Sequence, residues 1–325
     1  MLLRSCLLVA TICSILTPTL SGDEPTVTDV KTAKIEYRLQ GEYKGQIATD
    51  EGEEVWGAQI IALGRNKFDL VGYRGGLPGD GWKRGDETRK ASGRLVDETK
   101  IEFDLKEAVL QVTEGKLEVL VGDQVIATLP RVERTSPTLG KEPPAGATVL
   151  FDGKSIDQWT GGKLVDGQYL GATNVTSKKK LADHHLHIEF RTPFMPKSRG
   201  QGRGNSGVYV QGRYELQVLD SFGLEGENNE CGGFYSISKP NVNMCLAPLS
   251  WQTYDIDFTA AKYDGDKKVT NARVTVRHNG VVIHDDLELP NGTPGNQPEG
   301  PGPESLFLQD HGNPVVFRNI WILEK

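Results

Sequence analysis

Cysteine and methionine are scarce in this chain, and no long apolar run follows the first twenty residues. Only four cysteines and three methionines occur among 325 residues. The two cysteines outside the N-terminal segment, Cys231 and Cys245, are too few for a zinc site, which needs two pairs of closely spaced ligands. We therefore expect no metal. The lack of a later apolar stretch long enough to cross a bilayer also argues against membrane insertion.

An excess of positive charge is missing as well. The chain has 37 Lys and Arg against 44 Asp and Glu, a net charge of −7. An acidic protein repels phosphate backbones, so nucleic acid is excluded as a partner and a neutral ligand such as a carbohydrate fits better. The glycine-rich stretch 73–86 lacks a phosphate-binding pattern, and no cofactor is predicted. Trp82 in this stretch is interpreted either as a side chain packed on the sheet or as an aromatic tip that stacks on a sugar.

The N-terminal end predicts export. Residues 1–21 combine an early cation, Arg4, with a short apolar run and small residues, which is typical of a secretory signal peptide. A lipoprotein signal acylated on Cys13 is the alternative. The mature protein is expected to be secreted or periplasmic. In such an oxidising compartment Cys231 and Cys245, which would close a loop of about 15 residues, are predicted to form a structural disulfide.

Alternating apolar patterns indicate an all-β chain in two parts. Residues 27–134 contain roughly six strand-like segments, of which the first covers 35–43, and predict a small all-β domain. Residues 135–146 are rich in proline and small polar residues and are predicted to be a linker. Residues 147–325 contain about ten short strand patterns and no convincing helix, which predicts a two-sheet β-sandwich of the jelly-roll type.

Polar residues gather on one face of two consecutive strands between Gly204 and Asp220. Asn205, Glu215 and Gln217 recur at a spacing of two, and side chains of a strand alternate between the faces of a sheet. A sheet face that carries amides and carboxylates is suited to sugars. A second polar face is predicted on 185–191, where His185, His187, Glu189 and Arg191 alternate with apolar residues. A metal site on the H-x-H pair or a solvated face are the other interpretations.

Several blocks of the second part resemble the 3-keto-disaccharide hydrolase domain family, whose fold is similar to concanavalin-A-like lectins and glucanases. The resemblance covers 147–325 and rests on L-F-D-G-K-S-I-D-Q-W from Leu150, H-I-E-F-R from His187, G-N-S-G-V-Y-V from Gly204, Y-E-L-Q-V-L-D from Tyr214, and L-Q-D-H-G followed by V-F-R-N-I-W-I. It implies cleavage of a glycosidic bond in sugars oxidised to a ketone at C3. The ketone acidifies the C2 proton, so that a base, an acid and a group that stabilises the enolate suffice.

The candidate site residues follow from these patterns. Glu215 and Asp220 resemble the outer acids of a glucanase E-x-D-x-x-E motif, although Gln217 replaces the middle acid and only a bulge would bring Asp220 to the same face. His311, at the end of a strand, is a candidate proton shuttle or a turn cap. We predict Glu215, Asp220 and His311 as catalytic residues. The predicted substrate-binding residues are Glu189, Arg191, Asn205, Gln217, Gln309 and Arg318. Glu189 and Arg191 are expected beside the face that carries Glu215, Gln217 and His311.

Two other functions stay open at this point. A non-catalytic carbohydrate-binding module would be favoured if Glu215 and Asp220 lay away from any pocket. A cell-surface interaction protein would be favoured if the first domain covered the polar face. The oligomeric state is not predicted.

Overall fold

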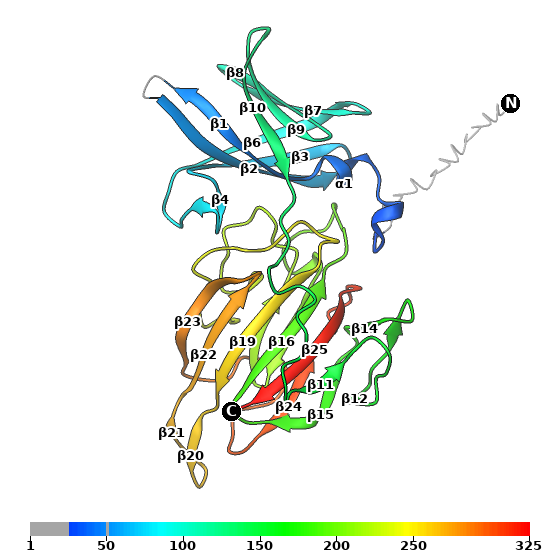
Figure 1. Ribbon diagram of the computed structural model, residues 1–325, viewed down its shortest axis with the longest axis vertical. Coiled ribbons are helices and arrows are strands. Elements are labelled where there is room, and N and C mark those ends of the chain that lie inside the picture. The colour runs from blue at the N-terminus through cyan, green and yellow to red at the C-terminus, as the bar shows by residue number, and fades with distance from the viewer. Residues whose placement is uncertain (1–25, 50–51) are drawn as a thin grey trace, which may run out of the picture.

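The computed structural model describes residues 26–49 and 52–325. The predicted signal peptide lies outside the described residues. The chain is 53% strand and only 4% helical, so the all-β prediction is confirmed. Two β-structured bodies lie one above the other, joined by the segment after β10 (Figure 1). Among the described residues no helix is long and apolar enough to cross a membrane.

The first body is a closed barrel of eight strands, whereas the sequence predicts roughly six. Its order is β1-β10-β9-β8-β7-β6-β3-β2, so no strand is left at an open edge. Apolar side chains fill the interior, among them Phe68, Ile101 and Phe103, each fully buried. The strands are β1 (Gly41–Thr49), β2 (Gly52–Gly64), β3 (Lys67–Arg74), β6 (Thr88–Asp97), β7 (Lys100–Leu105), β8 (Ala108–Thr113), β9 (Lys116–Val121) and β10 (Gln124–Val132), with the short β4 (Leu77–Pro78) and β5 (Gly81–Trp82) as a separate pair.

The predicted strand at 35–43 is only partly correct. A 3₁₀ turn, η1 (Val30–Thr32), and a one-turn helix, α1 (Ile35–Leu39), precede β1. Apolar residues at 35, 37 and 39 fit a strand, but Ile35 and Leu39 also lie four apart, which places them on one side of a helix. Both pack on the barrel core, with Leu39 fully buried. Burial of that pair accounts for the helix.

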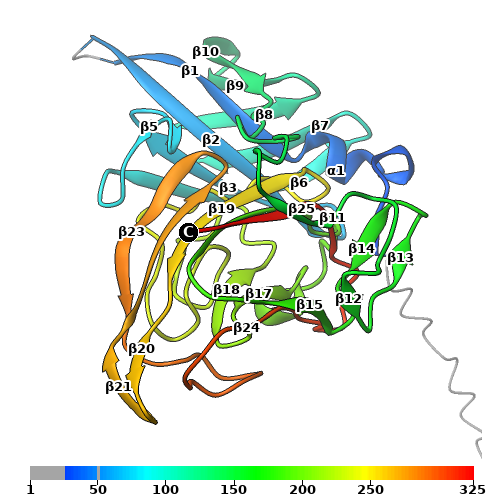
Figure 2. The same cartoon turned by 60° about the horizontal axis from the view of Figure 1, so that its bottom comes forward.

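The second body is a sandwich of two antiparallel sheets, as predicted. The eight-stranded sheet has the order β13-β14-β25-β16-β19-β22-β23, with β11 paired to β25, and the five-stranded sheet has the order β12-β15-β24-β17-β18. Figure 2 shows the sheet of β15, β24, β17 and β18 facing β25 and β19 of the other sheet. Apolar side chains of both sheets form one core between them.

The strands of the eight-stranded sheet are β11 (Thr148–Phe151), β13 (Leu164–Val165), β14 (Tyr169–Gly171), β16 (His184–Arg191), β19 (Gln252–Thr259), β22 (Ala272–His278), β23 (Val281–Leu289) and β25 (Val316–Glu324). Those of the five-stranded sheet are β12 (Trp159–Thr160), β15 (Val175–Leu181), β17 (Ser206–Val210), β18 (Tyr214–Val218) and β24 (Glu304–Leu308). A hairpin of β20 (Lys262–Asp264) and β21 (Lys267–Thr270) and a 3₁₀ turn, η2 (Gly200–Gly202), complete the body.

The segment 135–146, which we call the strap, lies against the sandwich and is not a free tether. It crosses the outer face of the eight-stranded sheet (Figure 1). The Ser136 and Thr253 hydroxyls are 2.6 Å apart, and the Thr138 hydroxyl donates to Asp255 Oδ2 at 2.7 Å. Its prolines and small residues reflect an extended course over a surface, with polar side chains that bind the sheet.

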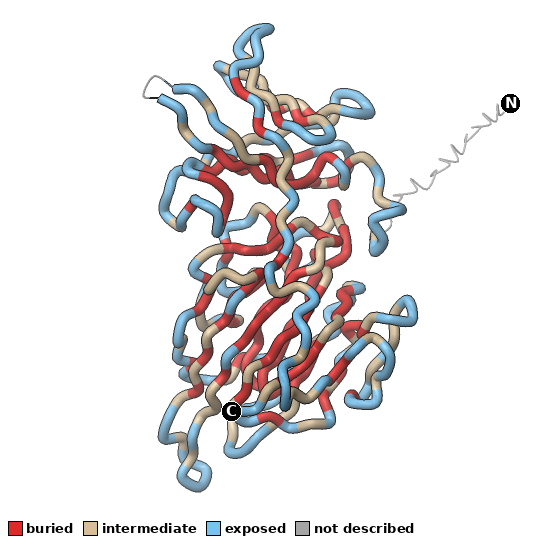
Figure 3. Tube along the Cα trace, viewed as in Figure 1, coloured by how far each residue is buried: buried red, intermediate tan, exposed pale blue. Residues whose placement is uncertain are grey.

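The two bodies also contact each other directly. Ile61, Val71, Tyr73 and Trp82 of the barrel pack with Phe222 of the sandwich in one buried cluster. Trp82 is 8% exposed with its ring centroid 5.2 Å from that of Tyr73, so the packed interpretation of this tryptophan is confirmed. Buried backbone continues from the barrel floor into the upper loops of the sandwich (Figure 3).

The predicted disulfide is not formed. Cys231 and Cys245 are buried free thiols. They lie next to each other, but each sulfur has its own hydrogen-bond partner: the Tyr254 hydroxyl at 3.2 Å for Cys231 and the Leu219 carbonyl at 3.5 Å for Cys245. Burial and hydrogen bonding therefore satisfy the two side chains as thiols.

Candidate functional site

A polar pocket of about 240 Å³ opens on the outer face of the five-stranded sheet. Strand alternation places it there: Val208, Leu216 and Leu308 point into the sandwich core, and their neighbours along β17, β18 and β24 point outward. No barrel residue contributes to the described lining. The residues that line it are Gln201, Asn205, Tyr209, Glu215, Gln217, Tyr235, Pro294, Gly295, Gln309 and His311.

Glu215 is the buried acid of this pocket. Only 4% of the residue is exposed, and burial raises the pKa of its carboxyl to about 7, with partial opposition from a hydrogen bond of the Tyr209 hydroxyl. Burial, and then the nearby Glu215, raise the pKa of Tyr209, so this phenol stays protonated and can donate. Neither lysine nor arginine occurs among the described residues that line the pocket. Glu215 can therefore exchange a proton near neutral pH.

Gly207 makes room for this carboxylate. It pairs with Gln217 across β17 and β18, beside the Tyr209–Glu215 pair. A Cβ at residue 207 would lie 2.5 Å from Glu215 Oε1 and 2.8 Å from Tyr209 Cε2, closer than real Cβ contacts. Any larger residue would displace the acid or the phenol.

Amide side chains form the rest of the pocket. Gln201 Oε1 accepts hydrogen bonds from Asn205 Nδ2 and Gln217 Nε2, both at 3.1 Å, and Gln309 Nε2 donates to the Tyr209 hydroxyl at 3.1 Å. The buried oxygens Asn205 Oδ1 and Gln309 Oε1 have no partner within the part of the chain that the structure describes. Unsatisfied buried acceptors are rare and costly. These two oxygens are suited to hydroxyl groups of a ligand.

His311 lies at the exposed rim of the pocket. It follows β24 in a loop held by two backbone contacts: the Asp310 N–H donates to Asn174 Oδ1 and the Gly312 N–H to Asp310 Oδ1, each at 2.8 Å. The loop thus places the exposed His311 imidazole at the mouth of the pocket, while the buried Glu215 carboxyl lies deeper inside it. Five predicted site residues, Asn205, Glu215, Gln217, Gln309 and His311, are thus brought together.

Asp220 does not join them. The β17–β18 register runs without a bulge, so the required change of face does not occur. The Asp220 carboxylate instead accepts a hydrogen bond from Arg203 Nε at 2.6 Å and lines a different cavity between barrel and sandwich. The expectation that Asp220 acts beside Glu215 is wrong for this geometry.

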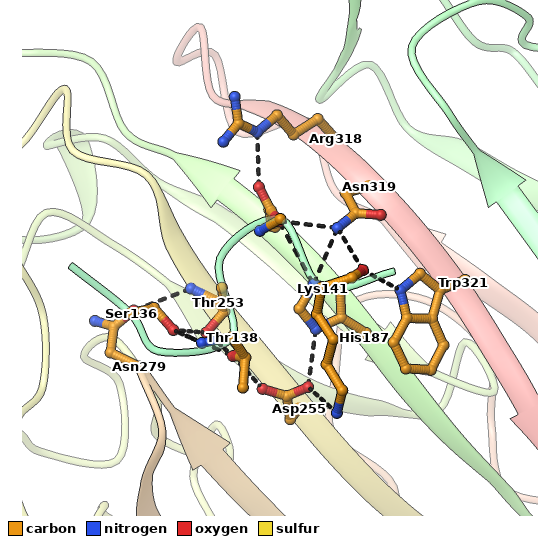
Figure 4. A network of polar contacts seen from close by, with 12 residues as sticks. Ser136, Thr138, Lys141, His187, Thr253, Asp255, Asn279, Arg318, Asn319 and Trp321 are labelled. Atoms are coloured by element: carbon orange, nitrogen blue, oxygen red, sulfur yellow. Dashed lines mark hydrogen bonds and ion pairs between the residues drawn. The ribbon is translucent and has the colours of Figure 1, made fainter. Parts of the chain in front are cut away.

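Glu189, Arg191 and Arg318 lie on the other sheet and do not reach the pocket. Glu189 is fully buried under the strap, where it accepts hydrogen bonds from the Gly140 N–H at 2.6 Å, Arg318 Nε at 2.7 Å and Asn319 Nδ2 at 2.9 Å. Figure 4 labels Arg318, Asn319 and His187 of this network. Burial alone would raise the pKa of Glu189, but these bonds and His187 lower it to about 2. The expectation that Glu189 and Arg191 lie beside the face of Glu215 is therefore wrong, and Arg318 does not line that pocket either.

A β-bulge explains how Arg318 and Asn319 both reach Glu189. The β16–β25 register shifts between His187 and Glu189, and Asn319 has a left-handed φ of 44°. Two consecutive polar side chains thereby turn toward one carboxylate. Arg318 also lies over the Trp251 ring, with its guanidinium carbon 4.0 Å from the ring centroid, and Arg191 lies over Tyr169 and Trp251 at 5.0 Å from each. These arginines are engaged in packing.

The H-x-H pair is engaged with carboxylates. His187 Nδ1 lies 2.8 Å from Asp255 Oδ1, and His185 Nδ1 lies 3.4 Å from Asp257 Oδ1. Burial would lower the pKa of His187, but hydrogen bonds to Asp255 and Glu189 raise it. Within residues 26–49 and 52–325, no group of three or more His, Cys, Asp or Glu is placed to hold a metal ion.

Comparison with known proteins identifies the second body. A family described as "3-keto-alpha-glucoside-1,2-lyase-like domain" matches residues 146–323, and the chain belongs to this family. A solved structure from Parabacteroides distasonis ATCC 8503, "a putative glycosyl hydrolase", is 34% identical, with a TM-score of 0.52 over 56% of this chain and 85% of that one. A second structure of the same description and organism is 19% identical, with a TM-score of 0.41 over 55% and 94%. No curated protein matches.

Some pocket residues were missed from the sequence. Tyr209 and Gly207 share the strand face of Asn205, so the same alternation that indicated Asn205 could have found them. Gln201, Tyr235, Pro294 and Gly295 come from turns and loops, and no periodic signal marks such positions. Their place in the pocket follows only from the folded chain.

Proposed function

We propose that the sandwich cleaves the glycosidic bond of 3-keto-glycosides in the Glu215 pocket. The observation that carries this proposal is Glu215 itself, a buried carboxyl with a pKa of about 7 among neutral amides. A general base acts best when its pKa is close to the working pH. Such a base is strong enough only for an acidified proton, and the C2 proton beside a C3 ketone is of that kind.

The reaction has two balanced steps. Glu215 removes the C2 proton, the C1–O bond breaks, and the leaving alkoxide takes a proton to depart as an alcohol. The remaining ring then has a C1–C2 double bond conjugated with the C3 ketone. Water adds at C1, a proton returns to C2, and the 3-keto sugar is released. The net result is hydrolysis.

His311 is placed to give the proton to the leaving oxygen, because it lies at the open rim where an aglycone would protrude. The unpaired oxygens of Asn205 and Gln309 would accept bonds from sugar hydroxyls, and Tyr209 would support the carboxylate. A non-catalytic binding module has no need for a carboxyl whose pKa is raised to about 7. The pKa of Glu215 therefore does not favour that alternative. The barrel leaves the pocket open, which disfavours the pure interaction-protein alternative.

The test is to incubate the purified protein with 3-keto-trehalose and 3-keto-sucrose, with the unoxidised disaccharides as controls. We expect free sugar only from the keto substrates. In D₂O the 3-keto product should contain deuterium at C2, detected by NMR. Cleavage of unoxidised parents at the same rate, or product without deuterium, would contradict the elimination route. Binding without cleavage would leave the carbohydrate-binding module.

We also propose that the protein is exported, since residues 1–21 have the pattern of a signal peptide. The N-terminal sequence of protein recovered from fractionated host cells checks this: uncleaved chain in the cytoplasmic fraction would contradict it.

A further inference from the structure

The contact between barrel and sandwich encloses a second cavity, of about 390 Å³, that the proposed reaction does not use. Strands β2, β3 and β6 form one wall, and residues 199–203 and 220–224 of the sandwich form the other. Its volume lies within the range of small-molecule sites, about 300 to 1,000 Å³. Both bodies are needed to build it.

Most of the wall is apolar. Ile61, Leu63, Leu70 and Val71 come from the barrel, and Phe222 and Leu224 from the sandwich. Leu224 is 43% exposed, a large apolar residue left partly open to solvent. A ligand with an apolar body would cover it and the wall behind it.

Two guanidinium groups stand at the sandwich side of this cavity. Arg203 pairs with Asp220 and donates to the Ala62 carbonyl of the barrel at 3.3 Å, and its buried Nη2 has no partner among the described residues. Within the described part of the chain, Arg199 donates to carbonyls alone, those of Pro196, Ser198 and Leu63. Burial and the charge of Arg203 lower the pKa of Arg199, which shows that the two cations oppose each other.

Two further charged residues line the cavity. Lys90 pairs with Glu225 at 2.5 Å, whereas the Asp69 carboxylate has the neutral Ser92 hydroxyl as its hydrogen-bond partner, at 2.7 Å. Across the described chain, no carboxylate forms an ion pair with Arg199. Asp69 and Asp220 raise the pKa of Arg199 through space and so offset part of its charge, but Arg199 has no direct carboxylate partner among the described residues.

We propose that this interdomain cavity binds a small organic monocarboxylate with an apolar or aromatic body. The body would pack on Ile61, Leu63 and Phe222, and the carboxylate would accept hydrogen bonds from Arg199, whose planar fork matches its two oxygens. Such a ligand would contact both bodies at once. A phosphate or other inorganic anion would leave the apolar wall uncovered.

Isothermal titration of the full chain with phenylacetate, and with phenylacetamide as its uncharged match, tests this proposal. We expect phenylacetate to bind with one-to-one stoichiometry and at least tenfold more tightly than the amide, as a charge-assisted bond implies. Arg199→Gln should abolish the difference between the probes. Leu224→Ala should weaken both probes by a similar factor. The matched control is Arg277→Gln, because Arg277 is an exposed arginine of β22 outside the cavity. This substitution should change the affinity for neither probe.

Binding of neither probe to the wild-type chain would overturn the proposal. Equal affinity for the two probes with no effect of Arg199→Gln would overturn it as well. The same is true if Arg277→Gln weakens phenylacetate as much as Arg199→Gln does, because the attraction would then be general. The glycoside assay does not enter these outcomes, so the two proposals can fail separately.

Discussion

Two buried glutamates on opposite faces of the sandwich differ sharply in their surroundings. Glu189, under the strap, is held by a histidine, an arginine, an amide and a backbone N–H, and its pKa is lowered to about 2. Glu215, in the open pocket, has one hydrogen-bonding side chain and no cation, and its pKa is raised to about 7. Both residues lie in the sequence blocks on which the resemblance to the family rests. Burial by itself therefore does not mark a catalytic acid, and the number of partners separates a structural anion from a reactive one.

The first and largest expected effect concerns turnover. Glu215→Gln keeps the size of the side chain but removes the base, and should lower the rate of 3-keto-disaccharide cleavage by about 10²–10⁴-fold. Glu189→Gln, assayed below its melting temperature, is the matched control and should keep the parental rate. A progress curve for both variants checks this. Loss of turnover only in Glu189→Gln would reverse the assignment.

The second effect concerns the free energy of unfolding. Here Glu189→Gln is expected to have the large effect, whereas Glu215→Gln has it in the rate assay. Glu189→Gln removes the charge that four groups bind under the strap and should lower the free energy of unfolding by about 3–5 kcal/mol, the range for breaking a buried ion pair. Urea unfolding measures it, with Glu215→Gln as the comparison at pH 5. If Glu189→Gln unfolds at the parental urea concentration, the network of Figure 4 does not stabilise the fold.

The third effect is a pH dependence. Because the folded-state pKa of Glu215 lies above its unfolded value, folding is favoured while the group is protonated, and that advantage disappears as pH rises through about 7. Glu215→Gln should therefore gain stability over the wild type at pH 8 to 9, by roughly 3 kcal/mol at most, and gain little at pH 5. Melting temperatures across this range check the sign. A constant difference would mean that Glu215 is ionised throughout.

Local patterns in the sequence predicted a large part of this result. Alternation along 185–191 and 205–217 correctly assigned inward and outward side chains, because the pleat of a strand enforces it. It could not say that the two polar faces belong to different sheets, since strand pairing joins residues far apart in the chain. For that reason the sequence wrongly predicts Glu189 beside Glu215, and it predicts Asp220 on the same face only through a bulge that the β17–β18 pairing does not contain.

The strap and the thiols show a second limit. Proline-rich composition predicts an extended segment but does not predict whether that segment packs on a surface. The sheet residues that bind Gly140 and Thr138 are distant in sequence, so no local pattern indicates these contacts. Spacing suggested that Cys231 and Cys245 could meet, and they do lie close together. Whether neighbouring thiols form a bond depends on the redox environment and on the geometry between the two sulfurs, and spacing along the chain defines neither.

The strap bears on where the chain can be cut when the sandwich is joined to another protein. The family match of the sandwich begins at residue 146, yet Ser136, Thr138 and Gly140 of the strap already bind the outer face of its sheet. A fusion protein in which the sandwich begins at the family boundary would carry unrelated residues above Glu189. The strap that belongs to the sandwich would stay attached to the barrel. The folded unit that keeps these strap contacts therefore starts about ten residues upstream of the family boundary, near residue 135.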